Sequence, residues 1–388
     1  MHPLKSLSAS LASILIATAC AAAPNTDAQF EAIGKRFVDE FGRYSPVDAT
    51  QLGDHRFDAE LDDLSPAGRT RSEAYASKLL SELQAIDREQ LSRANQVDAA
   101  VLENYLRYDL WRTEQLREWE WNPLVYTQLA GQSLYGLLAR DYAPASERLR
   151  AVTSRLEKLP RLLEQTRANL VAARVPPVHA ETAIKQNPGL LSLIDGLVVP
   201  QLDELPPADR ARLEAAIGSA RAAIDEHQTW LEEDLEPNAK GEFLIGRELY
   251  EKKLAFSLMS PLSREEIRKR AEAEVRRVRD DMYDVSRRAL KDSKHAPPMP
   301  DGPTPAQQQA VIEAALELAY AQRPAREDVV KLARMTLEET TEFARAKDFV
   351  TVPDEPLEII LMPEFQRGVA VAYCDSPGQL DKGQRTFY

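Results

Sequence analysis

The sequence predicts a mainly α-helical protein that ends in a short β hairpin or sheet edge. Apolar residues recur at helical spacing through most of residues 27–347, and prolines and capping residues mark the ends of the resulting segments. At about residues 356–375 the pattern changes to two β-rich runs, Glu358-Ile-Ile-Leu-Met362 and Val369-Ala-Val-Ala-Tyr-Cys374, on either side of a turn. We therefore expect a large multi-helix assembly with two neighbouring strands near its end.

Helical patterns account for the first half of the chain, with one irregular stretch. Phe30, Ile33, Phe37 and Phe41 share one helical face, and Ser65-Pro66 supplies an N-cap followed by a proline at the first helical position. The predictions are a helix over 27–43, a loop over 46–61, helices over 66–86 and 96–119, a buried loop or short helices over 122–143, and two helical stretches within 146–174 that break or kink at Pro160.

Further helices are predicted in the second half. They cover residues 209–235, 241–258, 263–291, 305–322 and 325–347. Ser263-Arg-Glu-Glu266 is a capping box, which defines the start of the third of these helices. Residues 295–305 contain five prolines and a glycine, so no helix can cross them. No long Gly/Ser linker separates independent domains, and residues 27–347 are therefore interpreted as one helical assembly.

The composition is that of an acidic globular protein. Of the 388 residues, 44% are hydrophobic and 29% are charged, and 62 acidic against 49 basic residues give a formal net charge of −13. This charge disfavours binding to nucleic acid or to an anionic membrane surface, because both require a basic face.

The first twenty residues have the pattern of an export signal. Lys5 precedes an apolar core at residues 11–16, and the small residues Ala17-Thr-Ala-Cys20 follow. We predict that residues 1–19 are a signal peptide and that Cys20 becomes the lipidated first residue of the mature chain. The protein would then be exported to the bacterial cell envelope, as a periplasmic or outer-membrane lipoprotein that touches the membrane only through its lipid. Ordinary secretion is the alternative, because Ala17 stands where such lipidation motifs usually carry Leu.

The titratable and nucleophilic residues form no catalytic motif. No two histidines lie one helical turn apart, as a zinc-binding helix would require. We expect His227 to lie on an exposed acidic helix face and Cys374 to be a small buried residue in a strand. Gly131-Gln-Ser-Leu-Tyr-Gly136 misses the Gly-x-Ser-x-Gly elbow of serine hydrolases by one position. No catalytic, cofactor-binding or metal-binding residue is predicted in this chain.

Two other groups of residues have alternative interpretations. Glu232-Glu-Asp-Leu-Glu236 and Glu338-Glu-Thr-Thr-Glu342 could pair carboxylates for acid–base chemistry, although solvated helix faces explain them better. Trp111, Trp119, Trp121 and Tyr126 could line a pocket for an apolar or peptide substrate, although packing in the core is favoured.

Short motifs follow one another in a fixed order along the chain. They are Ser45-Pro-Val-Asp-Ala-Thr-Gln-Leu-Gly-Asp54, Gln128-Leu-Ala-Gly131, Ala139-Arg-Asp141, Arg155-Leu-Glu-Lys-Leu-Pro160, Ala168-Asn-Leu170, Gly246-Arg-Glu-Leu-Tyr250, Ser263-Arg-Glu-Glu266, Val352-Pro-Asp-Glu-Pro356, Ala372-Tyr-Cys-Asp-Ser-Pro377 and Thr386-Phe-Tyr388. Together they resemble the bacterial family known as domain of unknown function 885 (DUF885), a group of exported proteins similar to zinc metallopeptidases.

The resemblance implies that residues 27–388 are the helical N-terminal portion of a DUF885-like domain. Family members continue into a helix with a His-Glu-x-x-Pro-Gly-His motif, and this chain ends before it. We therefore expect the catalytic C-terminal part, and zinc, only in full-length relatives. The strands would pair with an extended peptide substrate through main-chain hydrogen bonds. The residues concerned are Glu358, Ile359, Ile360, Leu361, Val369, Ala370 and Val371.

Two functions are compatible with this interpretation. The first is the N-terminal part of an exported zinc-metallopeptidase-like protein that is catalytically incomplete as given. The alternative is a non-catalytic cell-envelope lipoprotein that binds peptides or a protein partner. In both cases apolar surface should be exposed at Ile359, Leu361, Val369 and Val371, because later elements of the family would cover these strands.

Overall fold

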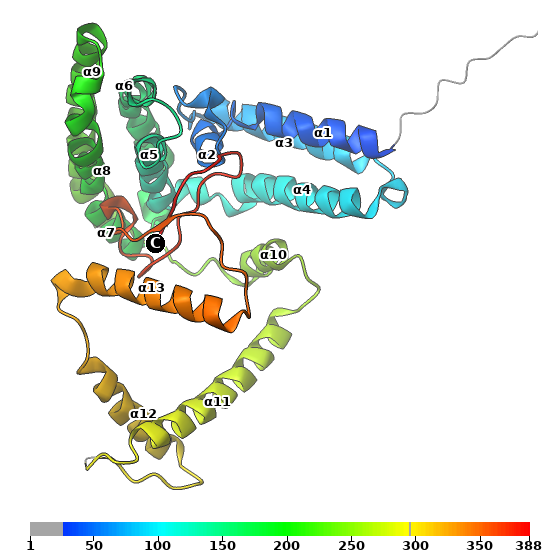
Figure 1. Cartoon of the computed structure of the whole chain (residues 1–388). Helices are drawn as coiled ribbons and strands as arrows, with labels where there is room; N and C mark the ends of the chain where they lie inside the picture. The colour runs from blue at the N-terminus through cyan, green and yellow to red at the C-terminus, as the bar shows by residue number, and fades with distance from the viewer. Residues whose placement is uncertain (1–25, 295) are drawn as a thin grey trace, which may run out of the picture.

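Residues 26–294 and 296–388 are described by a computed structural model, and the predicted signal peptide with Cys20 lies outside them. Most of the described residues are α-helical, which confirms the mainly α fold class. Two packed groups of helices, α1 with α3 and α4, and α2 with α5–α9, lie side by side. Helices α10–α13 form an excursion that leaves the second group and returns towards it (Figure 1).

The first group packs three long helices around one apolar cluster. They are α1 (Thr26–Phe41), α3 (Pro66–Gln84) and α4 (Arg93–Trp111), which bury Phe30, Ile33, Leu79, Leu83 and Leu106 between them. The predicted N-cap of α3 is confirmed, since the Ser65 hydroxyl accepts a hydrogen bond from the Gly68 amide at 3.0 Å. Local capping and helical periodicity thus predicted this group well.

The loop predicted over residues 46–61 is partly wrong. A short helix, α2 (Pro46–Gln51), begins at Pro46, and a 3₁₀ turn (His55–Phe57) follows it. Proline is favourable at a first helical position, and Val47 and Ala49 are fully buried, so packing stabilises one helical turn. This helix places Asp48 beside the first group of helices.

The second group contains α5 (Pro123–Leu138), α6 (Ala145–Asn169), α7 (Pro177–Gln186), α8 (Pro188–Leu193) and α9 (Pro207–Trp230). The prediction of a loop or short helices is wrong, because residues 123–138 form one regular helix, and the helix does not break at Pro160, because α6 continues through it. Leu156, Leu159 and Leu162 are fully buried on either side of that proline. Their packing outweighs the roughly 3 kcal/mol cost of an internal proline.

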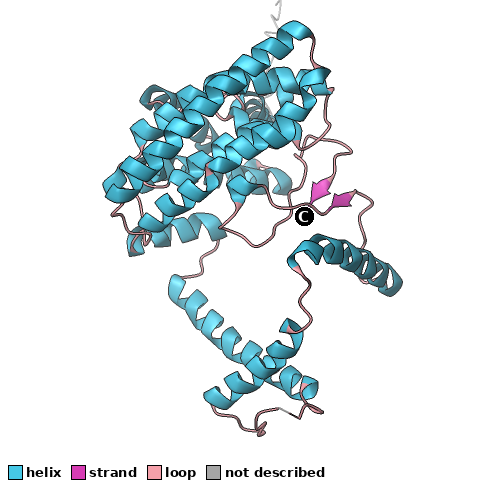
Figure 2. Cartoon of the chain, turned by 90° about the vertical axis from the view of Figure 1, so that its left-hand side faces the viewer, coloured by secondary structure: helices cyan, strands magenta, loops and turns pink. Residues whose placement is uncertain are grey.

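The excursion is made of α10 (Arg247–Leu258), α11 (Arg264–Ala289), α12 (Pro305–Tyr320) and α13 (Val329–Lys347). Ser263 caps α11 by accepting from the Glu266 amide at 3.1 Å, and residues 296–304 contain no helix, as predicted. Figure 2 shows α11 and α12 crossing at the end farthest from the bundle. Tyr283, Leu290 and Val311 form a small core between them.

The C-terminal segment contains a strand pair different from the predicted one. Strand β1 (Leu357–Glu358) pairs in parallel with β2 (Thr386–Phe387), with Leu357 opposite Thr386, whereas the run 369–374 pairs with neither strand. The predicted pairing of 358–362 with 369–374 is therefore wrong. Between these runs, Phe365 is 1% exposed and inserts against α5 and α8. This insertion pulls residues 363–367 into the bundle, so they cannot form a hairpin turn.

Glycines make room for Phe365 on both helices. A β-carbon at Gly131 of α5 would overlap the Phe365 ring, and one at Gly189 of α8 would overlap the Phe365 backbone. Gly131 therefore lies in a regular helix as a contact site, not as the loop residue that the sequence suggested. The neighbouring Ser133 is buried and donates to the carbonyl of Ala130 at 2.6 Å.

Arg155 of α6 lies at the centre of the bundle and is 0% exposed. Its guanidinium donates to the carbonyls of Glu60 (2.9 Å), Ser133 (2.8 Å) and Pro46 (3.4 Å) and to the Thr50 hydroxyl (2.6 Å). Burial lowers the pKa of Arg155, and the nearby carboxylates of Asp58 and Asp62 oppose this effect. One cation therefore joins α2, α5, α6 and the segment after α2.

Replacing Arg155 by methionine should lower the free energy of unfolding by about 3–5 kcal/mol, because buried carbonyls lose a shared donor and two nearby carboxylates lose a compensating positive charge. Arg150→Met is a matched control, since Arg150 lies on the exposed face of the same helix and pairs with Asp209 at 2.8 Å. Urea denaturation followed by circular dichroism measures both changes. Equal losses in the two variants would contradict the central role of Arg155.

Candidate functional site

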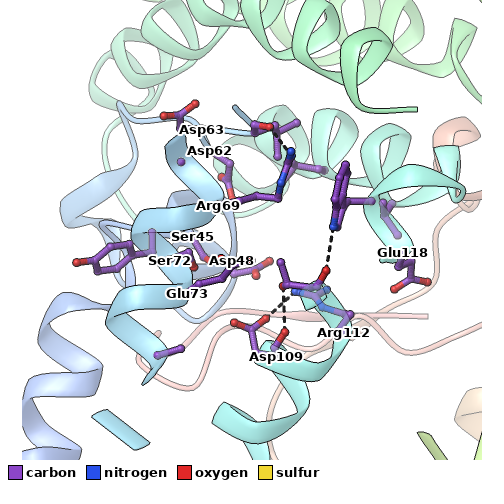
Figure 3. A pocket seen from close by; sticks show the side chains of 18 of the residues that line it. Ser45, Asp48, Asp62, Asp63, Arg69, Ser72, Glu73, Asp109, Arg112 and Glu118 are labelled. Carbon is purple, nitrogen blue, oxygen red and sulfur yellow. Dashed lines mark hydrogen bonds and ion pairs between the residues drawn. The ribbon is translucent and has the colours of Figure 1, made fainter. Parts of the chain in front are cut away.

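A cavity of about 420 Å³ lies between α1, α2, α3, α4 and α5 (Figure 3). We call it the acidic cavity. Its charged lining consists of six carboxylates and two guanidiniums, from Asp48, Asp62, Asp63, Glu73, Asp109, Glu118, Arg69 and Arg112. Its aromatic lining comes from Phe37, Phe41, Tyr44, Tyr75, Tyr105, Trp119 and Tyr126. Acidic and aromatic side chains therefore face the same space.

Two carboxylates of this cavity have raised pKa values. Burial and the charge of Asp48 raise the pKa of Asp62 to about 7. Within residues 26–294 and 296–388, Oδ2 of Asp62 accepts one hydrogen bond from another residue, from the Val47 amide at 3.2 Å. Burial also raises the pKa of Asp48. In contrast, hydrogen bonds from Ser65, Arg71 and Gln165 outweigh burial and lower the pKa of Asp63 to about 2. Burial therefore makes Asp48 and Asp62 harder to ionise than Asp63.

Both guanidiniums of the cavity are already engaged. Arg112 donates to Asp109 at 2.9 Å from the point where α4 passes into a π-helical turn (Arg112–Leu116), a distortion often found at functional sites. Arg69 donates to Asn169 at 2.9 Å and lies 3.8 Å above the Trp119 ring. The cavity can therefore accept an organic cation, which carboxylates and ring faces would stabilise together.

Sequence reasoning missed the acidic cavity. Its only signal was the repetition of aspartate in a segment interpreted as loop, at Asp48, Asp54, Asp58, Asp62 and Asp63. The aromatic run was partly a true signal, because Trp119 and Tyr126 line the cavity although Trp111 is packed in the core.

A second cavity, of about 740 Å³, lies between the start of α13, the C-terminal segment and Tyr135 of α5. We call it the apolar cavity. Its wall contains five of the seven residues predicted to pair with a peptide, namely Ile359, Ile360, Leu361, Ala370 and Val371. Val329, Val330 and Ala333 of α13 form the facing wall. The two β-rich runs thus meet around one cavity, although they do not pair as strands.

The predicted peptide-pairing residues differ in exposure. Leu361 and Val369 are 73% and 72% exposed and Val371 is fully exposed, which confirms the expected apolar surface at these positions. Ile359 is buried instead, and the expectation for it is wrong, because the segment turns inward after β1, where Arg334 donates to the Ile359 carbonyl at 3.0 Å. Glu358 lies in β1 and pairs with Arg385 at 2.7 Å.

Two further residues lie where the sequence did not place them. His227 is buried, not exposed, and stacks on Trp230; burial and nearby Arg167 lower the pKa of His227 to about 4. Cys374 is exposed instead of buried, because residues 371–374 run across the surface without a strand partner.

No group of three or more His, Cys, Asp or Glu side chains within residues 26–294 and 296–388 is placed to hold a metal ion. Neither cavity is interpreted as a metal site.

The comparisons with known proteins agree with the order of motifs in the sequence. No curated protein matches the chain. A solved structure from Shewanella oneidensis, described as "a putative lipoprotein of unknown function", is similar to 92% of this chain, with 26% identity and a TM-score of 0.70. The chain spans 64% of the length of that protein. In the described part of the chain, no helix is long and apolar enough to cross a membrane.

A family profile described as "Bacterial protein of unknown function (DUF885)" matches residues 46–388. This match covers α2–α9, the excursion and the C-terminal segment, and confirms the predicted resemblance. The chain belongs to the bacterial DUF885 family.

Proposed function

We propose that this chain is an exported, lipid-anchored protein of the bacterial cell envelope and that it forms the peptide-binding helical portion of a zinc-metallopeptidase-like protein. The observation that carries the peptide-binding part is the apolar cavity. Residues that the sequence alone selected for peptide pairing gather there from two separate runs. Export is supported by the signal pattern before Cys20 and by the likeness to a protein described as a lipoprotein.

The backbone beside the apolar cavity is suited to an extended peptide. Within the described residues, neither the N–H nor the C=O of Leu361 makes a hydrogen bond, and the amides of Ala372, Tyr373 and Cys374 donate none. Free main-chain groups of this kind can bind a peptide by adding it as a strand. The neighbouring apolar side chains would then receive alternate side chains of that peptide.

A non-catalytic envelope binding protein remains the alternative, and the same cavity would serve it. The metallopeptidase-like function requires peptide binding at residues 358–361 and 369–371, and the alternative would bind a peptide or a protein partner there. They differ in whether a catalytic part acts on the bound peptide, so the two are separated by assaying peptide cleavage by the gene product of the complete locus.

Peptide binding is tested with the pair Leu361→Pro and Leu361→Ala. Both variants remove the side chain, and only proline also removes the N–H, so proline should weaken binding of an extended apolar peptide about three- to tenfold more than alanine does. Fluorescence anisotropy of a labelled peptide measures the dissociation constants, and circular dichroism checks the fold. Equal affinity of the two variants would rule out main-chain pairing at this position.

The acidic cavity favours a second binding function, for an organic cation such as the side chain of an arginine or lysine residue. A bound cation stabilises the ionised form of Asp62, whose pKa is raised to about 7. Affinity should therefore increase as the pH rises through about 7, when Asp62 loses its proton before binding. Aromatic walls add cation–π stabilisation, and the stacked pair Tyr44 and Tyr75 has ring centroids 4.2 Å apart.

Asp62→Asn should lower the affinity for arginine amide at pH 8.5 and remove most of its pH dependence. Isothermal titration calorimetry at pH 5.5, 7 and 8.5 measures both effects. Asp354→Asn is the control, since Asp354 is exposed and makes no hydrogen bond or ion pair with any described residue. Identical pH profiles for the wild-type protein and Asp62→Asn would remove Asp62 from the site.

Lipidation is tested by expressing the wild-type protein and Cys20→Ala in a bacterium with a lipoprotein pathway. The wild-type protein should incorporate labelled palmitate and fractionate with membranes, and Cys20→Ala should lose both properties. Label that persists in Cys20→Ala would contradict lipidation at this cysteine.

A further inference from the structure

Residues 375–387 form a loop, here called the C-terminal loop, that is closed at its base. Asp375 and Phe387 exchange two backbone hydrogen bonds of 2.8 and 2.9 Å. Arg140 donates to the carbonyls of Asp375 (2.7 Å) and Arg385 (3.1 Å) and covers the Phe387 ring. Asp375 and Phe387 also line the apolar cavity. The base of this loop is therefore part of the cavity wall.

The tip of the C-terminal loop is attached to the segment after α2, more than 300 residues earlier in the sequence. The Leu380 amide donates to the Leu52 carbonyl at 2.9 Å. Gly53 has φ +85°, and a β-carbon there would lie 2.6 Å from the Asp381 nitrogen. A β-carbon at Gly378 would lie 2.3 Å from the Gly53 nitrogen. Glycine is needed on both sides, because the two backbones meet without room for side chains.

His55 joins the two segments at this contact. Its Nδ1 lies 3.0 Å from Oδ2 of Asp58, and its Nε2 lies 3.1 Å from Oδ1 of Asp381. A neutral imidazole has only one N–H, so one ring nitrogen would turn its lone pair toward a carboxylate. Only the protonated ring donates to both carboxylates. The arrangement therefore fits an imidazolium.

Asp58 is held by more hydrogen bonds than Asp381, so Asp381 is the carboxylate that can separate from His55. Asp58 also accepts from the Thr50 hydroxyl at 2.7 Å and from the Tyr142 hydroxyl at 2.6 Å, and the Tyr142 ring stacks on His55 with centroids 3.5 Å apart. In the part of the chain that the structure describes, Asp381 accepts otherwise only from the Gly378 amide of its own loop, at 3.2 Å. The other charged groups facing this contact are Asp54, which pairs with Arg56, and Arg155, which faces Asp58.

We infer that protonated His55 fastens the tip of the C-terminal loop to the helical bundle and that loss of this proton releases it, so that pH controls the wall of the apolar cavity. Burial alone would lower the pKa of His55, but hydrogen bonds to Asp58 and Asp381 outweigh it and raise that pKa. A raised pKa makes the attachment strongest below the ordinary histidine value, about 6.5, and weakens it as the pH rises through the folded value.

The test measures hydrogen exchange of the amides at 376–386 between pH 5.5 and 8.5, as protection factors normalised for intrinsic exchange. Protection should fall as the pH rises, by about tenfold for each unit by which attachment raises the pKa of His55. Asp381→Asn should show weaker protection at pH 5.5 and little dependence on pH, and NMR titration should show a lower pKa for its His55. Asp354→Asn should behave like the wild-type protein.

Protection that stays constant with pH in the wild-type protein, or that is unchanged in Asp381→Asn, would overturn the inference. An effect of the loop on peptide binding rests on the proposed function. If that function holds, the affinity for the labelled peptide should fall over the same pH range. If the loop responds to pH but no peptide binds at any pH, the proposed function fails and the attachment by His55 stands.

Discussion

The junction between α2, the segment after α2, α5 and α6 depends on one buried cation. Among the described residues the guanidinium of Arg155 has no direct carboxylate partner, and carbonyls from separate segments share its donors. Its charge is balanced at longer range by Asp58 and Asp62. One of these carboxylates lines the acidic cavity and the other holds His55. Burying a charge costs free energy unless such partners surround it. The position of Arg155 therefore constrains the positions of Asp58 and Asp62, and with them the two sites.

Helix α5 connects the two cavities in a similar way. Leu129 and Gln132 face the acidic cavity, whereas Tyr135, less than one turn further along, faces the apolar cavity. Between them, Gly131 receives the ring of Phe365. Helix α5 is thus a wall of both cavities. It fixes the position of the cavity suited to a cation relative to the cavity suited to apolar side chains. In a peptide with one basic and one apolar residue, the basic side chain matches the acidic cavity and the apolar side chain matches the apolar cavity.

Locally determined features could be predicted from the sequence, and features that depend on distant partners could not. Ser65 and Ser263 start their helices because each caps an amide three residues ahead. Gly131 suggested a loop, since nothing nearby reveals that Phe365 would fill the space above it. The partner of β1 lies at the end of the chain, and the intervening residues carry no signal for that register. The acidic cavity draws Asp48, Asp62 and Asp109 from separate segments, so no spacing marks it.

The insertion of Phe365 also has a topological consequence. It returns the chain to the core of the second helix group, to which α9 contributes before the excursion begins. Helices α10 to α13 are therefore an insertion with both ends fixed to the same core. Changes in the length or the packing of α11 and α12 should cost little at the bundle, because the loop they close is already long. Such an insertion can diverge between relatives while the bundle and both cavities keep their geometry.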